Sequence, residues 1–209
     1  MPNKLLEQGK INLLNWIKGN WAKEHSFTIA ITLVSLIVML FTPESSNLLR
    51  YQSIEVSQGE WWRIFSANLC HSNWYHWLLN ILGFWLMDIF YRPVLSANIR
   101  ASLIIFCMFA NVLLMHLFMN LTWYVGLSGA LHGYLIGGAL LSWKSAIKLN
   151  LIIVIVVCIK LVIELGWHIN QTTESLIGAN VVEESHAFGA LSAIIFFVIN
   201  YLKNKIRNQ

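Results

Sequence analysis

The sequence predicts an all-α membrane protein in which six transmembrane helices form one bundle. Hydrophobic residues make up 57% of the 209-residue chain, charged residues only 11%, and the mean hydropathy is +0.60. A soluble domain of ordinary composition carries about 25% charged residues, so this composition excludes the soluble classes. Six spans of about 20 residues each fit the length and leave little room for a separate soluble domain.

Six apolar stretches mark the predicted spans, at residues 27–42, 76–91, 99–119, 128–143, 149–167 and 186–202. We interpret the first as a retained anchor, because no small-residue cleavage motif follows it. The chain is thereby divided into an N-terminal segment (1–26), a membrane domain (27–203) and a tail (204–209). In residues 1–26, apolar residues recur at helical spacing between lysines, which suggests a helix lying on the inner leaflet. A partly ordered tail is the alternative.

The distribution of basic residues predicts the orientation in the membrane. Eleven of the 14 lysines and arginines lie before the first predicted span, between spans two and three or at the start of span three, between spans four and five, or after span six. In a six-span protein these segments share one side, and an excess of Lys and Arg marks the cytoplasmic side. Both termini are therefore expected in the cytoplasm. This even spread also argues against nucleic-acid binding, which needs a clustered basic patch.

Polar residues inside predicted spans are costly in a bilayer and therefore point to function. One group lies toward the outer ends of spans two, four and six: His71, His76, Asn80, Ser128, His132 and His186. Alternate spans place these residues at a common depth, so we expect one site assembled from three helices.

The sequence Gly126-Leu127-Ser128-Gly129 places a serine between glycines where a loop enters a predicted helix. Such a serine can expose its hydroxyl while its own backbone N–H points toward a developing oxyanion. The alternative is a packing face of small residues, since glycines recur every four positions from Gly129 and a similar pair begins at Gly189. The two readings are compatible, because close packing of spans four and six brings His186 to Ser128.

These motifs resemble those of the rhomboid intramembrane serine proteases, over roughly residues 59–193. The similarities are a Trp-Arg pair, the 5-then-4 spacing of two histidines and an asparagine, the Gly-Leu-Ser-Gly motif, and a histidine with a glycine three residues later. They fall at Trp62-Arg63, at His71, His76 and Asn80, at Gly126–Gly129, and at His186–Gly189. Six predicted helices without a seventh, and a histidine four residues after the serine, resemble the rhombosortase branch more specifically.

The resemblance implies a role for each matching residue. It implies Ser128 as nucleophile, His186 as general base, and His76 and Asn80 as oxyanion donors beside the Ser128 backbone N–H. A substrate pocket at His132, Gly126 and Gly129, and structural roles for Trp62, Arg63 and Gly189, complete the expected set.

The base and its partners can also be considered from the residues alone. His132 lies one helical turn after Ser128 and is the second candidate for the base. We expect a serine–histidine dyad without a carboxylate, because Glu183 and Glu184 fall in a predicted outer loop. Lys160 and Glu164 stand one turn apart in span five and are expected to neutralise each other. With no CxxC, HExxH or nucleotide loop, neither metal nor cofactor is expected.

The expected activity is cleavage of another protein's membrane anchor near the outer face. If the resemblance to rhombosortases holds, the substrates are secreted proteins with a C-terminal GlyGly-CTERM tail, in which a glycine-rich motif precedes a single span. It also implies a Gram-negative inner membrane with the site toward the periplasm, and no nucleic-acid partner. The alternatives are a catalytically silent rhomboid-like protein that binds membrane clients and, from the paired histidines, a haem-binding electron carrier.

Overall fold

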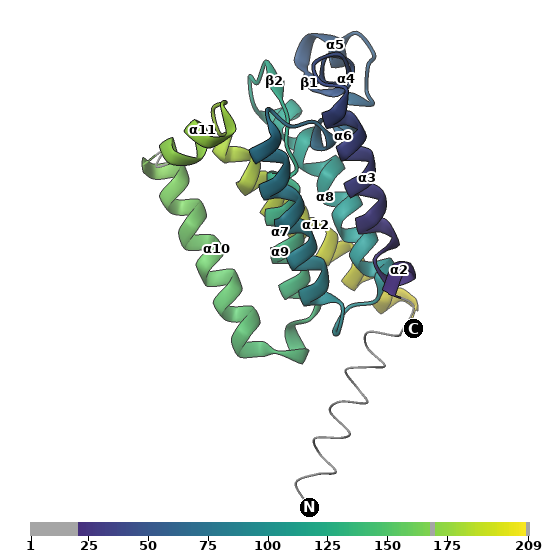
Figure 1. Ribbon diagram of the computed structural model, residues 1–209. Helices are drawn as coiled ribbons and strands as arrows, with labels where there is room; N and C mark the ends of the chain where they lie inside the picture. The colour runs from purple at the N-terminus through teal and green to yellow at the C-terminus, as the bar shows by residue number, and fades with distance from the viewer. Residues whose placement is uncertain (1–20, 168–169, 208–209) are drawn as a thin grey trace, which may run out of the picture.

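A computed structural model describes residues 21–167 and 170–207, and within this range the chain is built almost entirely of helices (Figure 1). Each predicted span coincides with one long helix: α3 (Ser26–Leu40), α7 (Trp74–Tyr91), α8 (Ala97–Phe118), α9 (Ser128–Leu141), α10 (Ile147–Trp167) and α12 (Glu183–Arg207). The prediction of an all-α fold is confirmed. Among the described helices, α8, α10 and α12 are long and apolar enough to cross a membrane, so six complete crossings stay a prediction.

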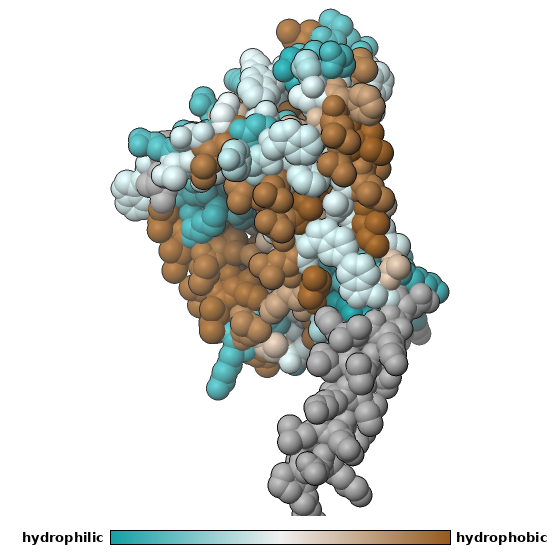
Figure 2. All heavy atoms as spheres, in the orientation of Figure 1, coloured by the Kyte–Doolittle hydropathy of each residue, from teal (hydrophilic) through white to brown (hydrophobic). Residues whose placement is uncertain are grey.

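Helix α9 is the centre of the bundle, since it contacts α7, α8, α10 and α12. Helix α10 lies to one side (Figure 1), and its buried residues are limited to Asn150, Val157 and Glu164. Hydrophobic side chains cover most of the visible middle and lower surface, while hydrophilic ones gather near α11 (Gln171–Ile177) and around α4 (Glu44–Leu49) (Figure 2). This distribution is that of a membrane protein with a polar end.

Small residues allow the backbones of α9 and α12 to pack directly against each other. A Cβ added to Gly133 would lie 2.5 Å from the carbonyl oxygen of Gly189, and one added to Gly137 would lie 3.2 Å from the Cβ of Ala193. A larger side chain at these positions would push the helices apart. The regularly spaced glycines therefore form a packing face, as the small-residue interpretation of the sequence predicted.

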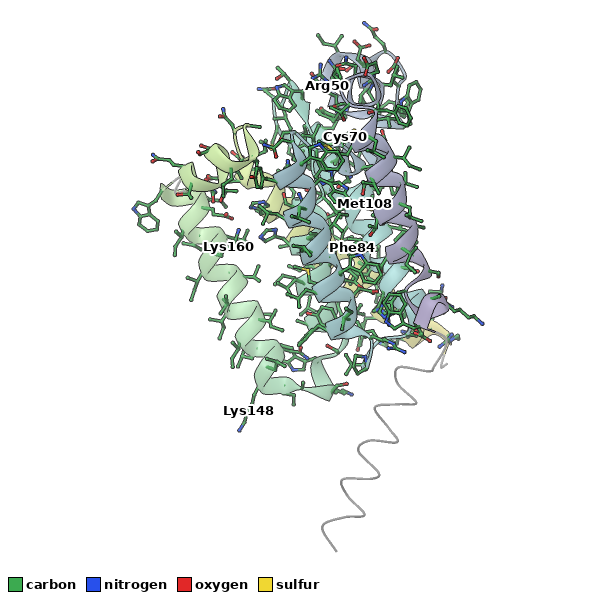
Figure 3. All side chains as sticks on the ribbon, viewed as in Figure 1. Arg50, Cys70, Phe84, Met108, Lys148 and Lys160 are labelled. Atoms are coloured by element: carbon green, nitrogen blue, oxygen red, sulfur yellow. The ribbon has the colours of Figure 1, made fainter. Side chains whose placement is uncertain are left out.

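The long connection between α3 and α7 folds over the end of the bundle that carries α11. It contains α4, the short strand β1 (Tyr51–Gln52), α5 (Ser53–Ser57), α6 (Arg63–Ser66) and the 3₁₀ turn η1 (Ala67–Leu69). Strand β1 pairs antiparallel with β2 (Trp123–Tyr124), so this connection is tied to the segment that leads into α9. Arg50 and Cys70 mark this end of the molecule in Figure 3.

A buried polar cluster joins four helices near the opposite end. The Asp88 carboxylate on α7 accepts hydrogen bonds from Thr28 of α3 (2.7 Å), Arg100 of α8 (2.7 Å) and Tyr134 of α9 (2.9 Å), and His25 also contacts it. A carboxylate inside a membrane domain needs such partners, because an isolated charge there is costly. The cluster fixes the relative positions of these helices at this end.

The chain ends depart slightly from the predicted boundaries. Most of the segment 1–26, with its predicted interfacial helix, lies outside the described residues; of this segment the structure describes α2 (Trp21–Glu24) and the beginning of α3. Helix α12 continues to Arg207, so residues 204–207 of the predicted tail are helical. Helix α2 and the end of α12 lie at the same end of the bundle, opposite α11 (Figure 1).

The three cysteines differ in exposure. Cys70 and Cys107 are buried, whereas Cys158 on α10 is exposed. Burial raises the pKa of the Cys70 thiol to about 12, so this group is protonated at neutral pH.

Candidate active site

Ser128 is the first residue of α9, and the segment before it is fixed on both sides. The β1–β2 pairing holds residues 123–124, and the Gly126 N–H donates to the carbonyl of Ala67 at 3.1 Å. Gly126 has φ +119°, a left-handed conformation that favours glycine, and a Cβ there would lie 2.8 Å from the His76 ring. Both features require glycine before the serine, and they hold the start of α9 against His76.

His186 lies next to Ser128 although 58 residues separate them in the chain. The His186 Nε2 is 3.2 Å from the Ser128 Oγ, within hydrogen-bond distance. The close approach of α9 and α12 through Gly133 and Gly189 makes this contact possible. A serine hydroxyl against an imidazole nitrogen is the arrangement needed to activate a nucleophile.

His132 is placed differently from His186. Its Nδ1 lies 2.8 Å from the Ser128 carbonyl oxygen, and because a carbonyl only accepts, Nδ1 carries the hydrogen. Its ring stacks on that of His186 with centroids 4.0 Å apart and planes at 23°. His132 thus contacts the backbone of Ser128 and forms a wall of the site, which favours His186 as the base.

A carboxylate does stand behind His186, contrary to our expectation of a dyad. The Glu164 Oε2 on α10 is 3.0 Å from the His186 Nδ1, and the Lys160 Nζ is 2.6 Å from the Glu164 Oε1. The predicted Lys160–Glu164 ion pair is therefore present, but it is only half of the arrangement. Sequence reasoning missed the contact with His186. Helical spacing identifies which residues of α10 are neighbours of each other, but it does not show which side of α10 packs against the bundle.

His76 and Asn80 lie on the adjacent face of α7 and line the same cavity as Ser128. The His76 Nδ1 lies 3.0 Å from the Ser72 hydroxyl oxygen and 3.4 Å from the Ser72 backbone nitrogen, and the His76 Nε2 lies next to Gly126. One N–H of the Asn80 amide donates to the His76 carbonyl at 3.0 Å, which leaves the second for another acceptor. The first N–H groups of α9 also lack acceptors within the helix.

His71, which has the sequence spacing of a site residue, is buried beneath this region. Its ring meets that of His76 edge to face with centroids 5.0 Å apart. Burial and the neighbouring His76 hold the pKa of His71 well below its ordinary value, so it is uncharged at neutral pH. It supports His76 instead of facing the cavity.

The cavity in front of Ser128 has a volume of about 680 Å³ and opens between α7, α10 and α11. Its lining combines the polar side chains described above with residues of β2 and of the 177–182 segment. Helix α9 has 14 residues, which corresponds to about 21 Å at 1.5 Å per residue, less than the roughly 30 Å of a hydrocarbon core. Helix α9 is therefore too short to span the hydrocarbon core on its own, and the cavity lies at its Ser128 end.

Comparison with known families identifies the fold. The model of the rhomboid domain matches residues 58–202, which include every residue of the site. The chain belongs to the rhomboid family. Members of this family are typically intramembrane serine proteases. A comparison with individual curated proteins gives no match.

In this rhomboid the Trp62-Arg63 pair shapes the connection between α3 and α7. Arg63 is buried, pairs with Glu60 at 2.5 Å, and donates to the carbonyls of Asn47 and Arg50, both at 2.9 Å. The Trp62 indole N–H donates to another carbonyl of α4 at 3.3 Å while most of its ring stays exposed. These contacts order the connection that carries β1, and through β1 they support the loop before Ser128.

The rhomboid site also contains the donor atoms of a possible metal centre. His132, Glu164 and His186 each offer one ligand atom, and these atoms all lie within 4.8 Å of one another. Two imidazoles and a carboxylate suit zinc chemically. Lys160 occupies one oxygen of the carboxylate, however, and both nitrogens of His186 already have partners, so the arrangement fits acid–base chemistry better than a resident metal.

Proposed function

We propose that this rhomboid is an intramembrane serine endopeptidase with Ser128 as nucleophile and His186 as general base. The observation that carries the proposal is the 3.2 Å contact between the Ser128 Oγ and the His186 Nε2 in a cavity at the polar end of the bundle. Catalysis by such a pair needs no metal or cofactor.

The first half of the reaction forms an acyl-enzyme. The His186 Nε2 takes the proton of the Ser128 hydroxyl as Oγ bonds to the scissile carbonyl carbon, and the carbonyl oxygen becomes an oxyanion. In the tautomer that carries its proton on Nε2, His76 stabilises this charge together with the free Asn80 N–H and the Ser128 backbone N–H. The C–N bond then breaks, and the proton on His186 passes to the leaving amine.

The second half releases the product. Water loses a proton to the His186 Nε2 while its oxygen attacks the acyl carbon, and the ester bond to Ser128 breaks with return of the proton to Oγ. The cavity at the polar end supports this step, since it offers water a route to Ser128, which begins a helix too short to span the hydrocarbon core.

For the substrate, we propose single-span proteins with a glycine-rich motif before the span, as in GlyGly-CTERM tails. Glycine weakens a helix by about 1 kcal/mol relative to alanine, so a glycine-rich segment unwinds more readily and exposes its carbonyl to attack. The His132-containing motif that resembles rhombosortases supports this choice. The proposed location is a bacterial inner membrane with six crossings, because the basic segments lie on the side opposite the site and mark the cytoplasm.

Co-expression with a GlyGly-CTERM reporter tests the proposal. The wild-type chain is expected to release the reporter from its anchor, and Ser128→Ala to leave it uncleaved. Ser192→Ala is the matched control, because Ser192 is a buried serine of α12 whose hydroxyl donates to its own helix at 2.7 Å. Reporter that is bound but uncleaved by the wild-type chain would favour a client-binding protein. Cleavage by Ser128→Ala would exclude Ser128 as the nucleophile.

A further inference from the structure

The His186 ring connects Ser128 to Glu164. Its Nε2 lies 3.2 Å from the serine hydroxyl and its Nδ1 lies 3.0 Å from the Glu164 Oε2, so one imidazole bridges the two side chains. The side chains of His186 and Glu164 are only 7% and 5% exposed. In such surroundings a charge on either group is felt strongly by the other.

The Glu164 side chain points into the bundle because Glu164 lies on the buried face of α10. The buried residues Asn150, Val157 and Glu164 are spaced by seven, about two helical turns, and therefore lie on one side of the helix. The large apolar side chains of α10, among them Ile152, Ile155 and Val162, are exposed on its other sides. Two of the three buried positions are polar, so this face is specialised for polar contacts inside the membrane domain.

Lys160 fixes the rotation of the carboxylate. Its Nζ contacts the Glu164 Oε1 at 2.6 Å, one turn earlier on α10, and leaves Oε2 for His186. The Lys160 side chain is 44% exposed and lines the cavity, whereas the Glu164 side chain is enclosed. Figure 3 shows Lys160 on the upper part of α10, toward the end of the molecule that carries α11.

We infer that Glu164 is a positioning residue that completes a Ser128–His186–Glu164 triad. The inference rests on the proposed function. The His186 Nδ1–H donates to the Glu164 Oε2, which leaves the lone pair of Nε2 directed at the Ser128 hydroxyl. When Nε2 takes the serine proton, the ring becomes positively charged and the carboxylate stabilises it. Glu164 stays ionised throughout, and no proton passes to it.

The ring is thereby held from two directions. Glu164 contacts its edge, and the His132 ring covers one face at 4.0 Å. This leaves little freedom for His186 to rotate away from Ser128. His132 supports the orientation of the ring, while Glu164 provides both orientation and charge.

Substitution of Glu164 by glutamine tests the charge with little change in shape. We expect Glu164→Gln to lower the kcat of reporter cleavage by about 10²- to 10⁴-fold with KM little changed, as for other triads that lose their carboxylate. Glu164→Asp is expected to recover part of the loss. Glu184→Gln is the matched control, since Glu184 is an exposed carboxylate two residues before His186 and is expected to keep wild-type kcat.

A double variant separates this role from simple neutralisation of Lys160. If Glu164 served only as an ion-pair partner, Glu164→Leu would leave a lone lysine, and the added Lys160→Leu would restore kcat. The triad predicts that Lys160→Leu/Glu164→Leu regains thermal stability but keeps the low kcat. Restored kcat in the double variant, or wild-type kcat in Glu164→Gln while Ser128→Ala is inactive, would overturn the triad alone. Cleavage by Ser128→Ala would overturn the proposed function itself.

Discussion

Replacement of Gly189 by alanine should separate the two halves of the active site. A Cβ at Gly189 would clash severely with the carbonyl oxygen of Gly129 and lie 2.7 Å from its carbonyl carbon, where ordinary contacts begin near 3.4 Å. These are backbone atoms of α9 and cannot rotate away. Helix α12 must therefore retreat from α9 by about 1 Å or more, and it carries His186 one turn before the substitution.

The loss can be estimated from the geometry. The Ser128 Oγ and His186 Nε2 are 3.2 Å apart, already at the long end for a hydrogen bond, so the retreat of α12 breaks the contact. A misplacement of about 1 Å at a reacting group costs about 10²-fold in rate. Overpacking a helix interface costs about 1–3 kcal/mol, so the midpoint of thermal unfolding is also expected to fall.

Two glycines of the same membrane domain provide controls. A Cβ at Gly166 would meet nothing within 4 Å, and one at Gly83 would meet only Leu131 at 3.6 Å. Reporter cleavage and fluorophosphonate labelling of Ser128, measured beside thermal unfolding in detergent, are expected to be unchanged in both alanine variants. If Gly189→Ala labelled and cleaved as well as Gly83→Ala, the reasoning from helix approach would be refuted.

Three further outcomes are expected. A reporter active only outside the cytoplasm should be active after Thr173 and silent after Gln209, and the reverse pattern would contradict the topology. His186→Ala should abolish labelling of Ser128, whereas His132→Ala, which removes a pocket wall, should lower cleavage and keep some labelling; the opposite result would make His132 the base. Cleavage should survive EDTA, while added zinc should inhibit by engaging the three pocket side chains whose ligand atoms lie within 4.8 Å of one another. A chelator-inactivated enzyme that zinc restores would instead indicate a resident metal.

Hydropathy was sufficient to predict the helices but not how they face each other. Each of the six apolar stretches became one helix, because a mostly apolar segment of 16 to 21 residues in a membrane has few other ways to satisfy its backbone hydrogen bonds. The approach of α9 and α12 was also predictable, since glycines every four residues form a flat face.

The contact of Glu164 with His186 was not predictable in the same way. Helix α10 is apolar on nearly all sides, so no polar stripe marks the side that packs inward. The fourteen-residue spacing of Asn150 and Glu164, about four helical turns, was the available signal, because two polar residues on one face of an apolar span indicate a buried contact. Asp88 had a comparable signal as a lone carboxylate within span two, but its partners come from three other helices and required the folded structure.

The unequal burial of the three cysteines makes the wild-type chain suitable for spectroscopic labelling. A thiol-directed probe should attach at Cys158, because Cys70 and Cys107 are enclosed and the Cys70 thiol is protonated at neutral pH. Cys158 precedes Glu164 by six residues, about 9 Å along the axis of α10. A spin label or fluorophore there would report on the helix that carries Glu164 without any engineered cysteine. Because this thiol is exposed on an apolar helix, the reagent must be one that partitions into lipid.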